Sequence, residues 1–172
     1  MVKLKPLPDI FPRNKPRILF IGTSPGKRSS LSRHYYAGNS NIFWKLIFEA
    51  GLTKKLLKSS QDRQLTHYGF GLTDVIKEPT LDQAKIKDER TLKDILKLHK
   101  RLLSHKPKIA AFVGKKGYRI FSRNKGKLEY GFQYRFNEDT IIFLLPSTSG
   151  QSYGDTNYTA KLKWFKELTK FL

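Results

Sequence analysis

Residues 18–26 read ILFIGTSPG: an apolar run that stops at a glycine and continues as two hydroxyl residues, a proline and a second glycine. A short, continuous apolar run rich in isoleucine is typical of a buried parallel strand, so the sequence predicts a strand over residues 17–22. The turn that follows raises a question of function, because it places Ser24 at the tip of a small-residue loop directly after a strand.

The rest of the chain alternates between strand and helix patterns. Further strands are predicted at 69–76, 108–114 and 140–146, and helices at 39–50, 89–105, 116–121 and 158–172, with a polar, hairpin-like stretch over 125–138. In the first helix Asn39 or Ser40 is the expected cap and Gly51 lies just past the end. In the second, the expected apolar face comprises Leu92, Ile95, Leu96, His99, Leu102 and Leu103. This alternation predicts an α/β fold with a mainly parallel four-stranded sheet covered on both faces.

Composition limits the classes of protein. The 172 residues suit one domain, which we expect over 17–172 behind a proline-rich extended arm at 1–16. The net charge of +20 favours a nucleic-acid partner, although a surface from a lysine-rich proteome is the alternative. The absence of cysteine excludes disulfides, thiolate catalysis and Cys-ligated zinc or iron–sulfur clusters. With no apolar segment of spanning length and no signal-peptide pattern, we expect a cytoplasmic protein with no membrane partner.

Three of the predicted strands end in polar, small-residue sequence, namely GTSPG, TDVIKEPT and LPSTSGQSYGD. Ligands of open α/β sheets bind beyond the carboxyl ends of the strands, so these loops are the candidate site. Each also has an ordinary interpretation: Gly22 and Gly26 as turn glycines, Asp74 as a satisfied or capping carboxylate, and residues 147–152 as a loop. Backbone amides in a turn such as GTSPG hold carbonyl or phosphate oxygens, which makes Thr23 and Ser24 candidates for contact with a base or a water.

An aromatic loop, RHYYAGNSNIFW at 33–44, follows that turn. Aromatic side chains that close over a base contribute about 1–3 kcal/mol of stacking. We expect Phe43 and Trp44 to be core residues at a helix start. The polar candidates for a pocket wall are therefore His34, Tyr35, Tyr36, Asn39 and Asn41.

The order of these motifs resembles the mismatch-specific uracil- and thymine-DNA glycosylases of the uracil-DNA glycosylase superfamily. The family pattern G-I-N-P-G, then N-x-F-W, G-x-G-x-T-N and P-S-S-S or N-P-S-G is matched here by GTSPG, NSNIFW, GFGLTDV and LPSTSGQS, over about residues 17–156. The resemblance implies a three-layer α/β/α sandwich that flips a deaminated or mismatched base out of DNA and hydrolyses its N-glycosidic bond. It implies no cofactor or metal, and duplex DNA as the partner.

The resemblance also implies roles for individual residues. The base pocket would comprise the turn residues Gly22, Thr23, Pro25 and Gly26 together with His34, Tyr36 and Thr80. The DNA backbone and the wedge would be contacted by Ser147, Thr148, Ser149, Gly150, Gln151, Ser152 and Tyr153.

Ser24 stands where the mismatch enzymes have the asparagine that positions the attacking water. A related branch, the hypoxanthine-DNA glycosylases, resembles this chain in its P-S-T-S motif, in an Asp-Val after the second strand and in having no asparagine in the first motif. That branch points to Asn41, and Asp74 is the second candidate because a carboxylate can orient or deprotonate water. The candidate catalytic residues are therefore Asn41, Asp74 and Ser24.

The sequence thus predicts a monomeric, nucleoid-associated DNA glycosylase that excises uracil first and hypoxanthine or G·T thymine next. One alternative is a non-catalytic protein of the same fold that binds mismatched or lesion-bearing DNA. Another is a basic α/β protein that binds a nucleotide or RNA through GTSPG.

Overall fold

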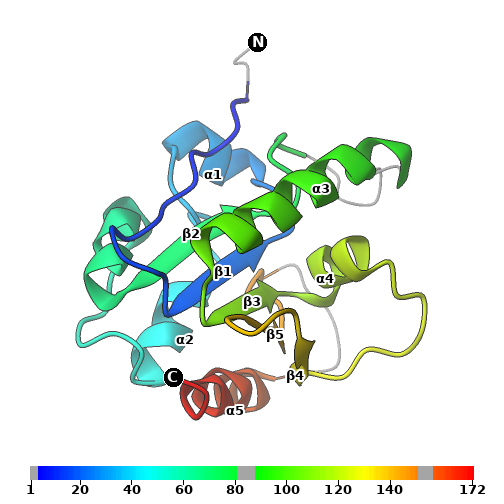
Figure 1. Cartoon of the computed structure of the whole chain (residues 1–172). Coiled ribbons are helices and arrows are strands. Elements are labelled where there is room, and N and C mark those ends of the chain that lie inside the picture. The colour runs from blue at the N-terminus through cyan, green and yellow to red at the C-terminus, as the bar shows by residue number, and fades with distance from the viewer. Residues whose placement is uncertain (1–3, 81–87, 151–156) are drawn as a thin grey trace.

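A computed structural model describes residues 4–80, 88–150 and 157–172. Its centre is a five-stranded sheet in the order β2-β1-β3-β5-β4, with helices on both faces (Figure 1). The strands β1 (Ile18–Gly22), β2 (Phe70–Asp74), β3 (Ile109–Val113) and β5 (Ile141–Leu145) are parallel. The α/β/α prediction is confirmed, because the sheet is mainly parallel and layered between helices.

The predicted number of strands was one too few. β4 (Gly131–Arg135) pairs antiparallel with β5 and forms one edge of the sheet. Its side chains are mostly exposed or half-buried, whereas those of the four parallel strands are buried throughout. An edge strand that faces solvent lacks a continuous apolar run, so the stretch 125–138 looked like a polar hairpin.

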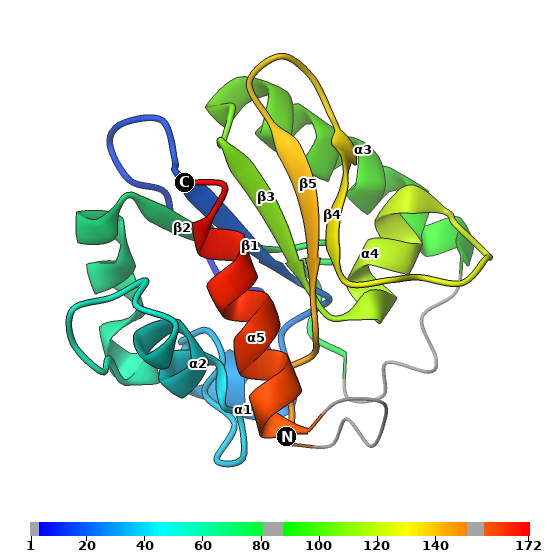
Figure 2. The same ribbon diagram turned by 90° about the horizontal axis from the view of Figure 1, so that it is seen from below.

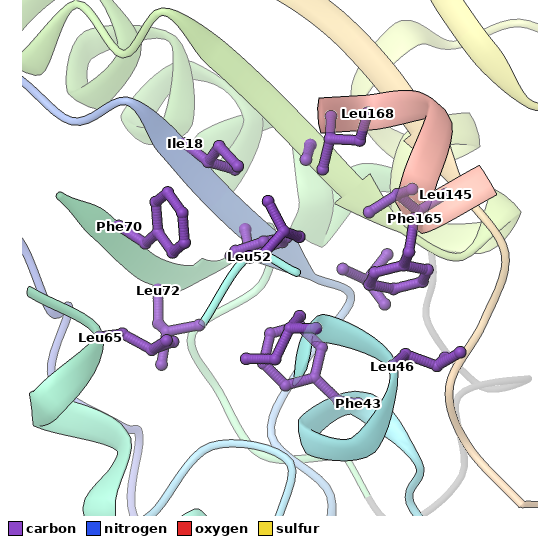
Figure 3. Packing of buried hydrophobic residues seen from close by; sticks show 14 of the residues in the cluster. Ile18, Phe43, Leu46, Leu52, Leu65, Phe70, Leu72, Leu145, Phe165 and Leu168 are labelled. Atoms are coloured by element: carbon purple, nitrogen blue, oxygen red, sulfur yellow. The ribbon is translucent and has the colours of Figure 1, made fainter. Parts of the chain in front are cut away.

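The two faces of the sheet carry separate apolar layers, because successive side chains of a strand point to opposite faces. On one face, Phe20 and Leu72 pack with α2 (Phe43–Glu49), α5 (Tyr158–Thr169) and the 3₁₀ helix η1 (Ser59–Tyr68). Figure 2 shows α5 crossing in front of the sheet on this side, and Figure 3 shows the side chains of α2 and α5 meeting those of the strands. On the other face, Leu19 and Phe112 pack with α3 (Asp88–His105) and α4 (Lys115–Ser122).

The predicted helices exist, with differences at their ends and faces. α2 begins at Phe43 instead of residue 39, and Gly51 follows its end with a φ of +77° as expected of a C-terminal glycine. In α3 the expected apolar face was partly wrong. The sheet is covered by Ile95, Leu98 and Leu102. About half of each of the side chains of Leu92, Leu96 and Leu103 remains exposed.

Two short helices, α1 (Lys27–Ser32) and η1, were not predicted. α1 has neither a capping side chain nor an acidic first turn, so its sequence carries no start signal. No helix in the described part of the chain is long and apolar enough to span a membrane.

The N-terminal segment lies along the edge of the sheet that β2 forms. Ile10 makes an antiparallel bridge with Leu72 through two backbone hydrogen bonds of 2.9 and 2.8 Å. Leu7 and Ile10 are buried in the core. A Cβ on Gly71 would lie 2.8 Å from the carbonyl oxygen of Ile10, so the glycine allows the arm to approach β2 this closely.

Candidate active site

The carboxyl ends of the parallel strands bring two predicted site residues into direct contact. Gly22, the last residue of β1, is the register partner of Asp74, the last residue of β2. A Cβ at Gly22 would collide with a carboxylate oxygen of Asp74, so Gly22 makes room for that side chain. Neither Gly22 nor Gly26 has a positive φ, hence the interpretation of both as conformationally required turn glycines is not supported.

The GTSPG turn is held by the chain that follows β2. The backbone N–H groups of Val75, Ile76 and Thr80 donate to the carbonyl oxygens of residues 22, 23 and 25 at 2.9, 2.9 and 3.2 Å. On the other side α4 packs against the turn, because a Cβ at Gly117 would lie only 3.0 Å from the Thr23 hydroxyl. These contacts fix the backbone of the turn beside Asp74.

Three polar atoms at this place are buried without a hydrogen-bond partner in the described part of the chain: Ser24 Oγ, Tyr36 Oη and Asp74 Oδ2. Tyr36 Oη lies 3.6 Å from the position that a Cβ of Gly22 would occupy, next to the Asp74 carboxylate. Unpaired buried polar groups each cost about 1–3 kcal/mol and are rare in folded proteins. The Tyr36 phenol and the Asp74 carboxylate lie together beside Gly22, and the Ser24 hydroxyl belongs to the turn that follows. Polar groups of this kind can bind a small polar group such as a water or the edge of a base.

Burial raises the pKa of Asp74 to about 7. The positive charges of Lys77 and Arg101 oppose this shift, and the negative charge of Asp9 adds to it. A group whose pKa lies near the working pH exchanges its proton readily, which is the property required of a general base. The side chain is only 4% exposed, so its carboxylate is shielded from bulk solvent.

Tyr36 forms an aromatic wall beside Asp74. Its ring stacks on Phe43 with the centroids 3.9 Å apart and an angle of 16° between the planes. Its φ of +51° lies in the left-handed region, which is uncommon for an aromatic residue and is often found at functional sites. Burial, followed by the nearby Asp74 charge, raises the pKa of Tyr36 well above its ordinary value, so its hydroxyl keeps the proton.

A family model for the uracil DNA glycosylase superfamily matches residues 8–172. The chain belongs to the uracil DNA glycosylase superfamily. Members of this superfamily are DNA glycosylases, hydrolases of base excision repair that act on uracil-like lesions. The match begins before β1, so it includes most of the N-terminal segment that lies along β2.

In this member of the superfamily, Asn41 lies just before α2. Its Oδ1 accepts a hydrogen bond from the backbone N–H of Phe43 at 3.0 Å. The prediction of Asn39 or Ser40 as the cap is wrong, because the N-cap residue is Ile42 and makes no side-chain capping bond. Phe43 and Trp44 are core residues, as expected. The hydrogen bond to Phe43 commits one face of the Asn41 amide to the helix start.

The candidate DNA-contacting loop meets the aromatic loop. The carbonyl oxygen of Thr148 accepts from the backbone N–H of Ile42 at 3.0 Å, and Thr148 is buried. A Cβ on Gly150 would collide with Ser40, and Ser147 lies against Gly114 at the end of β3. Ser149 follows in the same loop, with its backbone N–H donating to Ser147 Oγ at 3.3 Å. Gln151, Ser152 and Tyr153 lie outside the described residues.

His34 and Thr80 are placed less directly. His34 Nδ1 lies 3.2 Å from a carboxylate oxygen of Asp62, a buried residue of η1 whose other oxygen accepts from the Tyr35 N–H at 3.0 Å. This contact directs His34 toward η1. Thr80 reaches the GTSPG turn through its backbone N–H, while its hydroxyl bonds within its own loop, to Glu78 O at 3.4 Å.

Sequence reasoning missed three charged residues around Asp74, namely Asp9, Lys77 and Arg101. Lys77 had a signal, since it follows Asp74 by three residues in TDVIK. Asp9 lies in the arm and Arg101 among the lysines of α3, where no local pattern marks them.

Proposed function

We propose that this chain is a monofunctional DNA glycosylase that flips a deaminated or mismatched base out of duplex DNA and hydrolyses its N-glycosidic bond. The observation that carries the proposal is that Ser24, Tyr36 and Asp74, at or beside the carboxyl ends of β1 and β2, each have a buried polar atom without a hydrogen-bond partner among the described residues. Superfamily membership and the charge of +20 support DNA as the substrate. We propose uracil as the preferred base, hypoxanthine next and G·T thymine as a further substrate.

In the proposed reaction Asp74 acts on water. The ionised carboxylate accepts a proton from a water molecule as the water oxygen bonds to C1′ of the deoxyribose. The bond from C1′ to the base nitrogen breaks, and its electron pair leaves with the base. The base takes up a proton from solvent and Asp74 releases the proton it accepted to solvent, which regenerates the carboxylate. The Ser24 hydroxyl is suited to orient the water because it both donates and accepts hydrogen bonds.

The flipped base requires a pocket that compensates the few kcal/mol lost on unstacking. Tyr36, stacked on Phe43, is the aromatic surface that we propose contacts the base. Backbone groups of the turn 22–26 are proposed to bind its polar edge, with Asn41 at the rim. The loop 147–150, joined to residues 40 and 42, is proposed to press on the DNA backbone of a substrate bound by one protein monomer.

One observation favours a second candidate function, a protein of the same fold that binds lesion-bearing DNA without cleaving it. Ser24 replaces the asparagine that the mismatch-specific enzymes use to position water. A serine side chain is shorter, and misplacement of the water would cost orders of magnitude in rate.

The experiment that separates the two uses end-labelled duplexes with a single U·G, T·G, hypoxanthine·T or normal pair, followed by alkaline cleavage of abasic sites. The proposal expects breaks at the lesion and none at the normal pair. It also expects Asp74→Asn to lose at least about 100-fold in rate, as for a general base, with lesion binding retained. If the wild type binds every duplex and produces no break, the proposed enzymatic function is wrong and the second candidate, a DNA-binding protein, is favoured. Equal cleavage by Asp74→Asn would move the catalytic role to Asn41 or Ser24, for which the alanine variants are the matched tests.

A further inference from the structure

The N-terminal arm contributes a carboxylate to a half-buried charged group next to β2. Asp9 Oδ1 accepts hydrogen bonds from Lys77 Nζ and from the Thr73 hydroxyl, both at 2.6 Å. Asp9 Oδ2 accepts from Arg101 Nη1 at 3.1 Å, and the same nitrogen donates to Thr73 Oγ1 at 2.8 Å. The side chains of Lys77 and Arg101 are only 20% and 14% exposed, and Asp9 is a directly bonded countercharge for both cations.

This charged group contacts the backbone of Asp74 and the aromatic loop that carries Tyr36. Arg101 Nη2 donates to the backbone carbonyl of Asp74 at 3.3 Å, which ties α3 to the end of β2. Lys77 Nζ donates to Tyr35 Oη at 3.2 Å, and Tyr35 immediately precedes the aromatic wall residue Tyr36. Displacing either cation would therefore disturb the backbone of Asp74 or the aromatic loop.

The arm is itself fixed to α1, to the aromatic loop and to β2. The contacts join Lys5 to Ser30 of α1, Pro6 to Arg33, Pro8 to Tyr35 and Ile10 to Leu72 of β2. Asp9 lies between the last two of these contacts. Its position is thus determined by backbone pairing on one side and by the aromatic loop on the other.

The charges around Asp74 act in opposite directions. Lys77 and Arg101 stabilise its carboxylate, while Asp9 and burial oppose ionisation. Tyr36, which packs against Asp74 from the aromatic loop, is un-ionised. Burial alone raises the pKa of Asp9, yet Lys77, Thr73 and Arg101 hold it below its ordinary value, so Asp9 is an anion at neutral pH.

We propose that Asp9, from the N-terminal arm, is a positioning residue for Asp74 and acts through Lys77 and Arg101. The inference rests on the proposed function in the sense that Asp74 is the group that activates water. The arm then completes the active site, because it supplies the anion that holds both cations beside Asp74.

The direct test is the titration of the Asp74 carboxyl group by ¹³C NMR in the full-length chain. If Asp9 acts through the two cations, Asp9→Asn releases Lys77 and Arg101 from their place beside Asp74, and this outweighs the loss of its own charge, so the midpoint is expected to rise. Lys77→Met removes a positive charge and is expected to raise the midpoint as well, and each rise should be on the order of one pH unit. Lys77→Arg should keep the wild-type midpoint. The matched control is Lys15→Met, because Lys15 pairs with Asp139 away from Asp74.

Upward shifts in both variants, together with a matching shift in the pH profile of base excision, would support the proposal. General loosening of the structure would expose Asp74 and lower its midpoint, because burial is the main cause of the raised pKa. A downward shift in folded Asp9→Asn, or no shift, would therefore overturn the proposal. If Asp9→Asn does not fold, the comparison of Lys77→Met with Lys77→Arg decides. A wild-type chain that excises no base would refute the proposed function, and the NMR titration would still test the role of Asp9.

Discussion

Replacing Asp74 by Asn should stabilise the folded protein increasingly as the pH rises. Burial raises the pKa of Asp74 to about 7 in the folded state, whereas an aspartate in an unfolded chain ionises near pH 3.9. Between these two values the unfolded chain has released its proton and the folded protein has not, so wild-type stability falls with rising pH. The loss is complete above pH 7, where both states are ionised.

The size of the effect follows from the same two values. At about 1.36 kcal/mol per pH unit between the two pKa values, the wild type loses about 1.5 kcal/mol of its free energy of unfolding by pH 5 and about 4 kcal/mol by pH 8. Asn has no charge to desolvate. The free energy of unfolding of Asp74→Asn, relative to that of the wild type, should therefore increase by about 2.5 kcal/mol between pH 5 and pH 8. Any constant difference between an amide and a carboxyl group cancels in this comparison. For a chain of this length the gain corresponds to roughly 5–10 °C in Tm.

The assay is denaturant unfolding of both proteins at pH 5 and pH 8, with Glu138→Gln as the control. Glu138 is an exposed carboxylate, so its amide variant should follow the wild type at both pH values. A difference between Asp74→Asn and wild type that is the same at pH 5 and pH 8 would refute the reasoning. It would mean that the carboxyl group is solvated or already paired in the folded protein.

Three further predictions concern the proposed site. Gly22→Ala should destabilise the protein by about 1–3 kcal/mol and reduce base excision, since its Cβ would displace Asp74. Gly26→Ala, whose Cβ would meet nothing within 4 Å, should leave the stability unchanged, and equal losses of stability in thermal unfolding would contradict this. The rate of excision should fall as the pH drops below about 7, because Asp74 is then protonated, and a rate that stays flat down to pH 5 would count against a base at this position. Affinity for undamaged duplex should fall by orders of magnitude between 50 and 200 mM salt in a filter-binding assay, as expected if the +20 charge contacts phosphates, and salt-independent binding would exclude that role.

The parallel core of the fold could be predicted from the sequence because its strands are buried on both faces. Ile18–Gly22 and Ile141–Leu145 are continuous apolar runs, and their type and position followed from that pattern. β4 lacked this signal because it lies at the edge of the sheet with an exposed face. The face of α3 was misjudged since leucine occurs all round the helix, and only tertiary packing selects Leu98 over Leu96.

Site residues were predictable where a strand end marked them. Gly22 and Asp74 were singled out separately by their position after a strand, and the parallel register of β1 and β2 then brings them together. Asp9 had no such mark, because its partners lie 64 to 92 positions further along the chain. Contacts of this kind depend on the topology of the sheet, which makes β2 an edge strand and leaves it open to the arm.

The position of Ser24 is best understood together with that of Asp74. A family member with asparagine in the first motif can hold water with a neutral amide, but the serine here has a shorter side chain with a single oxygen. The carboxylate of Asp74 lies against Gly22, two residues before Ser24. Within the part of the chain that the structure describes, Asp74 and Ser24 each have a buried side-chain oxygen without a hydrogen-bond partner. In the proposed mechanism the task moves from the turn to the end of β2, where a base takes the place of the amide. Such a base requires a pKa near neutrality and nearby cations that keep the carboxylate ionised. Burial and the pair Lys77 and Arg101 meet those two requirements in opposite directions, and Asp9 holds the cations in place.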